Sequence, residues 1–160
     1  MKRLIAILTA LLVISLSSAA FAEKLVVAHD TNFKPFEFKQ NGEFVGFDID
    51  MWKEVAKRMN LDYEFQPMDF NGIIPGLQAG SIDAAVAGIT IKPSRAEVVD
   101  FSDGYFDNAQ GVLVLKDSPF ADAQSISDLK DARLGAQVGT TGLEFINETI
   151  QPNEEPKVYD

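Results

Sequence analysis

Arg95 is a cation at a place where its own helix does not favour one. Ser94 and Glu97 have the S-x-x-E spacing of a capping box, which predicts a short helix that begins at Arg95 and runs to Val99. A positive charge in the first turn is mildly unfavourable, because the helix dipole already places partial positive charge there. Two interpretations follow: Arg95 is a solvated surface charge, or it binds an anion near the start of the helix.

Other polar groups fall where a parallel sheet would bring them close to Arg95. In an open sheet of parallel strands, ligands bind beyond the carboxyl ends of the strands. The stretches expected at those ends supply a carboxylate, two phenylalanines, hydroxyls and backbone N–H groups; they are residues 29–33, 68–70, 88–90 and 139–142. This set suits a small zwitterion, because arginine can bind a carboxylate through two parallel hydrogen bonds.

Single members of the set have ordinary structural explanations as well. Phe33 and Phe70 could enclose the apolar stem of a ligand, or they could be core residues. Asp30 could accept a hydrogen bond from an ammonium or amide group, or it could cap a turn. The turn at residues 139–142 could bind an anion at a helix start, although many helices begin after glycine. The convergence of the whole set on one edge of the sheet favours a binding site.

The sequence holds few groups for catalysis, so we predict no enzyme, no cofactor and no metal site. The chain has one histidine and no cysteine. Nucleophile-elbow, dinucleotide-binding and P-loop motifs do not occur in the sequence. We interpret the histidine, His29, as a strand-end residue rather than a base. The net charge of −10 argues against nucleic acid and anionic lipid as partners.

The amino terminus has the pattern of a secretory signal peptide. Lys2 and Arg3 form a basic start, residues 4–16 form an apolar run, and Ala20-Phe21-Ala22 is a cleavage signature. We expect cleavage after Ala22, export to the periplasm, and a mature protein that begins at residue 23.

The apolar pattern alternates between strand and helix, which indicates a parallel α/β fold. In the first part of the chain we expect strands at 24–28, 63–67 and 83–87, and helices at 48–59 and around 73–77. Pro75 should lie near the start of the second helix and Gly80 should end it. The pattern begins again after Tyr105, with strands at 111–115, 134–138 and 157–159, and helices at 125–130 and 143–149. This divides the chain into a first lobe, residues 23–106, and a hinge with an incomplete second lobe, residues 107–160.

Several stretches resemble one family closely. Residues 46–56, GFDIDMWKEVA, resemble the signature of the bacterial extracellular solute-binding proteins, family 3, which are the polar amino acid receptors of ABC importers. The stretches AHDTNFKPFEF, PMDFNGIIPGLQAGSIDAAVAGITI and FSDGYF are most similar to its glutamine-binding members. The resemblance implies a periplasmic-binding-protein-like α/β fold, with two parallel-sheet lobes and a hinge that close around one amino acid.

The resemblance also implies roles for single residues around the backbone groups of the ligand. Arg95 would bind the α-carboxylate of the amino acid, assisted by Thr90 and by the backbone of Thr140. Gly88 would present its carbonyl oxygen to the α-amine.

The remaining predicted ligand residues surround the side chain of the amino acid. Phe33 and Phe70 would stack on its stem, and Asp30 would read its end. Gln137 stands where the glutamine-binding members have a lysine, which leaves the choice of amino acid open. Thr141 completes the predicted set.

Family members are longer than this chain, so we interpret it as the front portion of a receptor. The complete protein would be a monomer that delivers its amino acid to a permease in the inner membrane. We expect residues 23–160 alone to be marginally folded, to associate and to bind amino acids only weakly. Two alternatives stay open: an enzyme similar to cyclohexadienyl dehydratase, and the sensor domain of a larger protein.

Overall fold

The computed structural model describes residues 24–160, so the predicted signal peptide lies outside the described residues. The strands are β1 (Leu25–His29), β2 (Asn32–Phe33), β3 (Glu37–Gln40), β4 (Glu43–Val45), β5 (Tyr63–Pro67), β6 (Ala84–Ala85), β7 (Gly135–Gln137) and β8 (Lys157–Tyr159). The α-helices are α2 (Phe47–Met59), α3 (Phe70–Ala79), α4 (Pro93–Ala96) and α5 (Thr141–Phe145). A 3-10 helix covers Ile126–Leu129, and a π-helical turn, Ile146–Ile150, continues α5.

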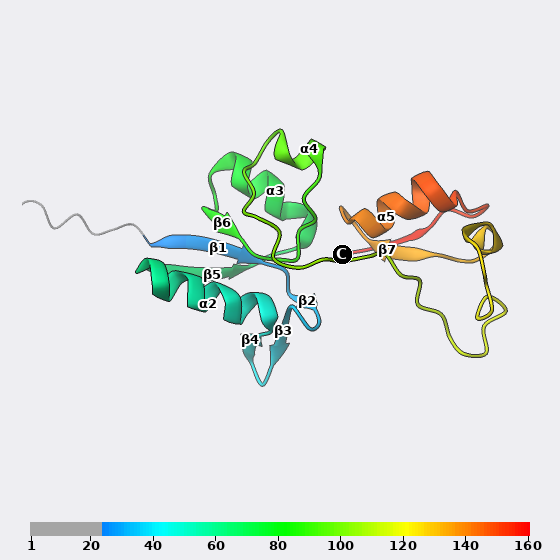
Figure 1. Ribbon diagram of the computed structural model, residues 1–160, viewed down its shortest axis with the longest axis horizontal. Coiled ribbons are helices and arrows are strands. Elements are labelled where there is room, and N and C mark those ends of the chain that lie inside the picture. The colour runs from blue at the N-terminus through cyan, green and yellow to red at the C-terminus, as the bar shows by residue number, and fades with distance from the viewer. Residues whose placement is uncertain (1–23) are drawn as a thin grey trace, which may run out of the picture.

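The first part of the chain is built on a parallel sheet in the order β5-β1-β6. The central strand β1 carries Val27 and Ala28, which are fully buried. Helix α2 lies on one side of this sheet and α3 on the other (Figure 1). The predicted parallel sheet with helices on its faces is therefore confirmed.

The strand boundaries differ from the predicted ones most at β6. The predicted strand at 83–87 forms ladder pairs only at Ala84 and Ala85. Just before them, the Asp83 carboxylate accepts a hydrogen bond from Val26 N–H at 2.8 Å, so a side chain takes the place of a backbone partner. Just after them, the chain turns away at Gly88, where φ is +54°.

A small antiparallel sheet, in the order β2-β3-β4, was not predicted. Its hairpin pairs Gln40 with Glu43, and the turn residues Asn41 and Gly42 both have positive φ. An Asn-Gly dipeptide between two strands is the strongest short-range hairpin signal, because the favoured two-residue turns require positive φ. This signal was present in the sequence and would have identified the hairpin.

Helix α2 agrees with the predicted helix at 48–59 and starts one residue earlier. Its first N–H groups are bound by the chain ahead of β3: Phe47 N–H donates to the Pro35 carbonyl at 3.1 Å, and Asp48 N–H donates to the Phe36 carbonyl at 2.9 Å. These bonds place the start of α2 directly beside β3. Asn60 ends the helix in the left-handed conformation.

Helix α3 is longer than predicted and carries Pro75 in its interior rather than near its start. Proline cannot donate the hydrogen bond that Asn71 would otherwise accept. The fully buried Ile73 packs into a core with Ala28, Ile82 and Ala87, and this burial offsets the missing bond. Gly80 ends the helix in the left-handed conformation, as predicted.

The predicted capping box at the start of α4 is wrong. The helix begins at Pro93, its N-cap is Lys92, and no side chain caps it. Proline favours the first helical position because its fixed φ suits a helix and its missing N–H is not needed there. Ser94 is therefore inside the helix, and Arg95 is the third of its four residues rather than the first.

The second part of the chain pairs β7 with β8 in parallel, packs α5 against β7, and packs the 3-10 helix against the π-helical turn that continues α5. Its core consists of Leu129, Ala132, Ile146 and Ile150. The predicted strand at 134–138 and helix at 143–149 are present with shifted ends. The predicted helix at 125–130 is a single 3-10 turn, held at its start by a hydrogen bond from Ser125 N–H to the Asp128 carboxylate at 2.9 Å.

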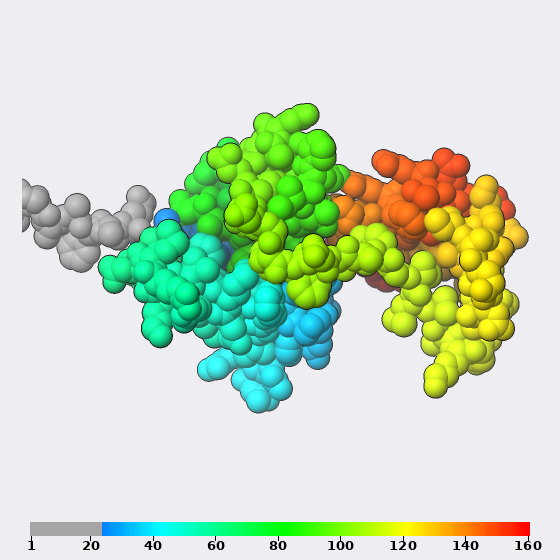
Figure 2. All heavy atoms as spheres, viewed as in Figure 1, coloured from blue at the N-terminus to red at the C-terminus, as the bar shows by residue number. Residues whose placement is uncertain are grey.

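The predicted strand at 111–115 is wrong. Leu113 is 99% exposed and Leu115 is 76% exposed, and no strand within residues 24–160 pairs with this segment. An apolar β-branched run becomes a strand only where another strand supplies hydrogen-bond partners. The chain near residue 110 instead forms the connection from the first group of elements, β1 to α4, to the second group, which contains β7, β8 and α5 (Figure 2). No helix of the described chain is long and apolar enough to cross a bilayer.

Candidate functional site

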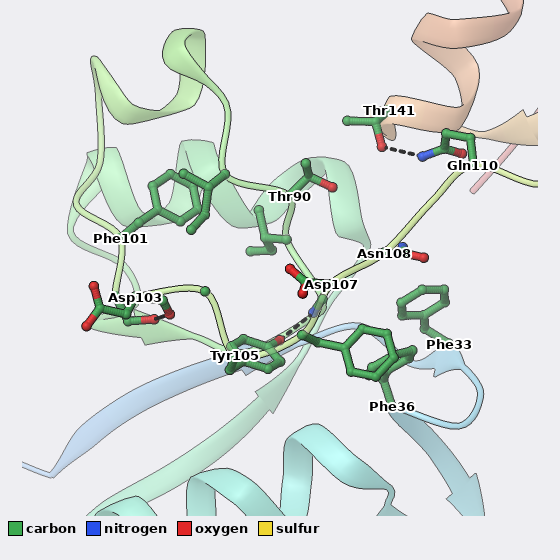
Figure 3. A pocket seen from close by; sticks show the side chains of 16 residues that line it. Phe33, Phe36, Thr90, Phe101, Asp103, Tyr105, Asp107, Asn108, Gln110 and Thr141 are labelled. Atoms are coloured by element: carbon green, nitrogen blue, oxygen red, sulfur yellow. Dashed lines mark hydrogen bonds between the residues drawn. The ribbon is translucent and has the colours of Figure 1, made fainter.

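A cavity of about 260 Å³ lies where the carboxyl ends of β1 and β6 face the start of α5. All nine predicted ligand residues line it; they are Asp30, Phe33, Phe70, Gly88, Thr90, Arg95, Gln137, Thr140 and Thr141. Four further residues complete its wall, namely Ala87, Asn108, Gln110 and Gly142. A larger cavity of about 500 Å³ adjoins it (Figure 3) and shares six lining residues with it, namely Phe33, Gly88, Thr90, Asn108, Gln110 and Thr141.

Arg95 is buried and held in place by backbone carbonyls, so its interpretation as a solvated surface charge is wrong. Its side chain donates from Nη1 to the Thr90 carbonyl at 3.0 Å and from Nη2 to the Gly139 carbonyl at 2.9 Å. The guanidinium carbon lies 5.6 Å from the centre of the Phe70 ring. Burial lowers the pKa of Arg95, and the negative charge of Glu144 offsets part of this effect. A guanidinium has five N–H donors, so others remain for an anion.

Asp30 both binds the N–H of the next residue and reaches across the cavity. It is 3% exposed, and its Oδ1 accepts a hydrogen bond from Thr31 N–H at 2.6 Å. Its Oδ2 accepts one from the side-chain amide of Gln137 at 3.0 Å. A carboxylate can accept about four hydrogen bonds, so Asp30 keeps acceptor capacity for a ligand.

The two phenylalanines line the cavity in different ways. Phe33 is 37% exposed and stacks on Phe36, with ring centres 5.1 Å apart and planes inclined by 17° (Figure 3). Phe70 packs against the core of the first sheet and also lies under Arg95. Phe70 is therefore a core residue and a cavity wall at once.

Gly88 sits where a side chain would not fit. A Cβ added to it would lie 2.8 Å from Cε1 of Phe33, and its φ of +54° strains any other residue. Its N–H donates to the Asp48 carboxylate at 2.8 Å. Thr90 contributes its carbonyl to Arg95, and its assistance in binding the ligand carboxylate stays a prediction.

The start of α5 closes the opposite wall of the cavity. Thr140 is the N-cap residue: its Oγ1 accepts from Leu143 N–H at 3.2 Å, and its hydroxyl donates to the Gln137 carbonyl at 2.7 Å. The Thr141 hydroxyl accepts a hydrogen bond from the Gln110 amide at 2.9 Å (Figure 3). Gln110 was missed because no motif marks it, and only the crossing of the chain brings it to the cavity.

His29 is the last residue of β1, as predicted, and it is fully buried. Its Nδ1 lies 2.6 Å from the Asp30 carbonyl oxygen, and the ring meets Phe44 and Phe65 edge to face. Burial lowers the pKa of His29, which favours the neutral ring. Within residues 24–160, no group of three or more His, Asp or Glu side chains could hold a metal ion.

An ion pair between Lys92 and Glu144 joins the loop before α4 to α5 beside the cavity. Both side chains are partly exposed, so water screens their attraction. We expect Glu144→Gln to lower the free energy of unfolding by only about 0.2–1 kcal/mol at low salt. Denaturant melts at low and high salt would check this, because the difference should vanish at high salt. A loss that persists at high salt would contradict the assignment.

The fold and the cavity together define a periplasmic-binding-protein-like α/β protein. The chain belongs to the bacterial extracellular solute-binding proteins, family 3, and the family pattern matches residues 25–157.

Proteins similar to this chain carry the names of amino acid-binding proteins. The ABC transporter arginine-binding protein 1 of Escherichia coli (strain K12) is 34% identical over 161 aligned residues, which cover 100% of this chain and 63% of the relative. A solved structure of an ancestral arginine-binding protein bound to arginine is 42% identical with a TM-score of 0.77, and covers 85% of this chain and 59% of that one. The corresponding structure bound to glutamine is 42% identical with a TM-score of 0.79, and the match covers 86% of this chain and 60% of that one. The chain therefore spans about three fifths of the length of these proteins.

Proposed function

We propose that this protein is the substrate-binding component of an amino acid ABC importer, which captures a polar amino acid and delivers it to a permease in the inner membrane. The observation that carries the proposal is the single cavity that collects all nine predicted ligand residues around a buried, hydrogen-bonded Arg95. Its volume of about 260 Å³ suits a ligand smaller than a drug-sized molecule.

In the proposed complex, the α-carboxylate lies on the guanidinium of Arg95. The stem of the side chain passes between Phe33 and Phe70, and its polar end meets Asp30 and Gln137. Family membership and the arginine- and glutamine-bound neighbours support this arrangement.

The charges in the cavity favour some amino acids over others. Gln137 is neutral, so it leaves the negative charge of Asp30 in place. A cationic or amide side chain can donate to that carboxylate, whereas an acidic side chain is repelled by it. We therefore propose arginine, lysine, histidine and glutamine as candidate ligands, and we propose that glutamate is rejected.

Export and assembly are part of the same proposal. The signal peptide at residues 1–22 would direct the protein to the periplasm and be removed after Ala22. The first lobe would comprise residues 23–106, and residues 107–160 would form the hinge and part of the second lobe, with the complete protein acting as a monomer.

Titration of the purified, isotope-labelled protein with L-arginine, L-glutamine and L-glutamate, followed by NMR, tests the proposal. NMR is suited to this because it detects millimolar as well as tight binding. We expect saturable shifts at the amides of Asp30, Gly88 and Thr140 with arginine or glutamine, and much weaker ones with glutamate. Absence of saturable shifts with all three amino acids, in a folded sample, would overturn the proposal.

A further inference from the structure

Two carboxyl groups, Glu37 on β3 and Asp48 on α2, are buried beside the cavity but do not line it. Both are fully buried. They are brought together by the bond from Asp48 N–H to the Phe36 carbonyl, next to Glu37 in the chain. Neither forms an ion pair with a residue of the described chain. Two ionised carboxylates without a cation would be very costly in such a place, so one of them must be neutral.

The oxygen atoms of this pair show which bonds are made and which are missing. Oδ2 of Asp48 accepts from Gly88 N–H at 2.8 Å and from the Tyr105 hydroxyl at 3.0 Å. Oδ1 of Asp48 and both oxygens of Glu37 are buried without a hydrogen-bond partner. A single proton on Glu37, donated to Oδ1 of Asp48, removes two of these three unsatisfied atoms at once.

The electrostatics agree with this geometry. Burial, followed by the negative charge of Asp48, raises the pKa of Glu37 to about 9. Burial and Asp48 also raise the pKa of Tyr105, so its hydroxyl remains a donor. At neutral pH the pair then carries one charge, on Asp48, where the two donors point.

Asp48 binds both the wall of the cavity and the segment of chain that leads to the second group of elements. Gly88 forms part of the cavity wall, in a backbone conformation with positive φ. Tyr105 begins the stretch that crosses to the second group of elements, and its hydroxyl also lies 3.2 Å from Gly88 N. One carboxylate oxygen therefore ties the wall of the cavity to the start of the crossing segment.

We propose that Glu37 and Asp48 are positioning residues that share one proton, and that this pair holds Gly88 and Tyr105 in the geometry that the ligand requires. The readout by ligand affinity rests on the proposed function. The groups that face Glu37 are Asp48 on α2, Asp30 after β1 and Tyr105 on the crossing segment. Loss of the shared proton would place a second negative charge among them, push the carboxylates apart and release Gly88 and Tyr105.

The decisive comparison is between the wild type and Glu37→Gln, which keeps the shape and a donor but cannot ionise. In the wild type, the affinity for L-arginine or L-glutamine should fall by up to about tenfold per pH unit above a pH of about 9. The α-amine of the ligand also titrates there, but equally for both proteins. The fall in affinity that ionisation of Glu37 causes should therefore be absent in Glu37→Gln. Identical pH profiles in the two proteins would overturn the proposal.

Two readouts do not need a ligand, and they separate this proposal from the proposed function. The Gly88 amide resonance should titrate near pH 9 in the wild type and not in Glu37→Gln. Because Glu37 ionises near 4.5 once unfolded, the stability of the wild type should fall as the pH rises from about 4.5 to about 9, and Glu37→Gln should lack this fall. If no amino acid binds, these two measurements still test the shared proton. A Gly88 amide resonance with the same pH dependence in the wild type and in Glu37→Gln would contradict the proposal.

A third variant tests the link through Tyr105. Tyr105→Phe removes only the hydroxyl, and we expect it to shift the Gly88 amide resonance and to weaken ligand binding several-fold. Tyr63→Phe, on β5 and away from the cavity, is the matched control and should do neither. Equal effects of the two variants would show that the Tyr105 hydroxyl has no positioning role.

Discussion

Arg95→Ala is expected to lower the affinity for the amino acid by about tenfold to several hundredfold, because a charge-assisted hydrogen bond contributes on the order of 1.5–3 kcal/mol. The guanidinium is buried and fixed by the carbonyls of Thr90 and Gly139, so little freedom is lost when a carboxylate binds to it. Calorimetry or an NMR titration with L-arginine and L-glutamine measures the change.

Two further variants make this result specific. Arg95→Lys keeps the positive charge but loses the planar pair of donors, so it should restore only part of the affinity. Arg133→Ala removes an exposed arginine that does not line the cavity, and it should bind as the wild type does. Since Arg95 also holds Thr90 and Gly139, each variant must first give a folded NMR spectrum. Unchanged affinity in a folded Arg95→Ala protein would refute the carboxylate assignment.

The second large effect is expected at Asp30, and it concerns the ranking of ligands rather than binding in general. Asp30→Asn removes a buried negative charge and keeps one side-chain oxygen that can accept from Thr31 N–H, while the amide of Gln137 would have to turn its own oxygen toward the new NH2 group. Affinity for arginine should fall by about tenfold to a hundredfold, whereas glutamine should lose less and glutamate should gain. Competition experiments with the three amino acids give the ranking directly.

Phe70→Ala provides the contrast to that experiment. Phe70 is an apolar wall, so its removal should weaken every amino acid alike, by roughly 1–3 kcal/mol of lost apolar burial. Because Phe70 also packs against the core, the melting curve of the Phe70→Ala protein must be recorded together with its affinities. If Asp30→Asn lowered the affinities for all three amino acids by the same factor, as Phe70→Ala should, Asp30 would not be the residue that distinguishes them.

The chemistry of the cavity could be inferred from residue types and from one rule of architecture. Polar residues at the carboxyl ends of parallel strands meet at one edge of a sheet, and for that reason Asp30 and Gly88 could be placed together from the sequence alone. Thr140 was expected at the same edge, but it follows β7 of a separate sheet and approaches the cavity from the opposite wall. The family resemblance supplied Gln137 and the roles of the others. Local pattern also sufficed for β5, for α2 and for the end of α3 at Gly80, because these depend on side-chain periodicity and on a glycine in the left-handed conformation.

Tertiary structure decided everything that depends on partners distant in the sequence. The run at 111–115 has the composition of a strand, but it remains unpaired because no neighbouring strand of the described chain reaches it. The role of Gln110 and the use of the Gly139 carbonyl by Arg95 arise only when the chain crosses from the first group of elements to the second.

The buried pair beside the cavity shows the same division most clearly. In the sequence, Glu37 and Asp48 read as ordinary acidic residues, one on a short strand and one in the first turn of a helix where acids are common. A carboxyl group acquires an unusual pKa from burial and from its neighbours, and neither is local in the sequence. Sequence therefore determined which groups are available to this protein, and the packing of distant segments decided their environment.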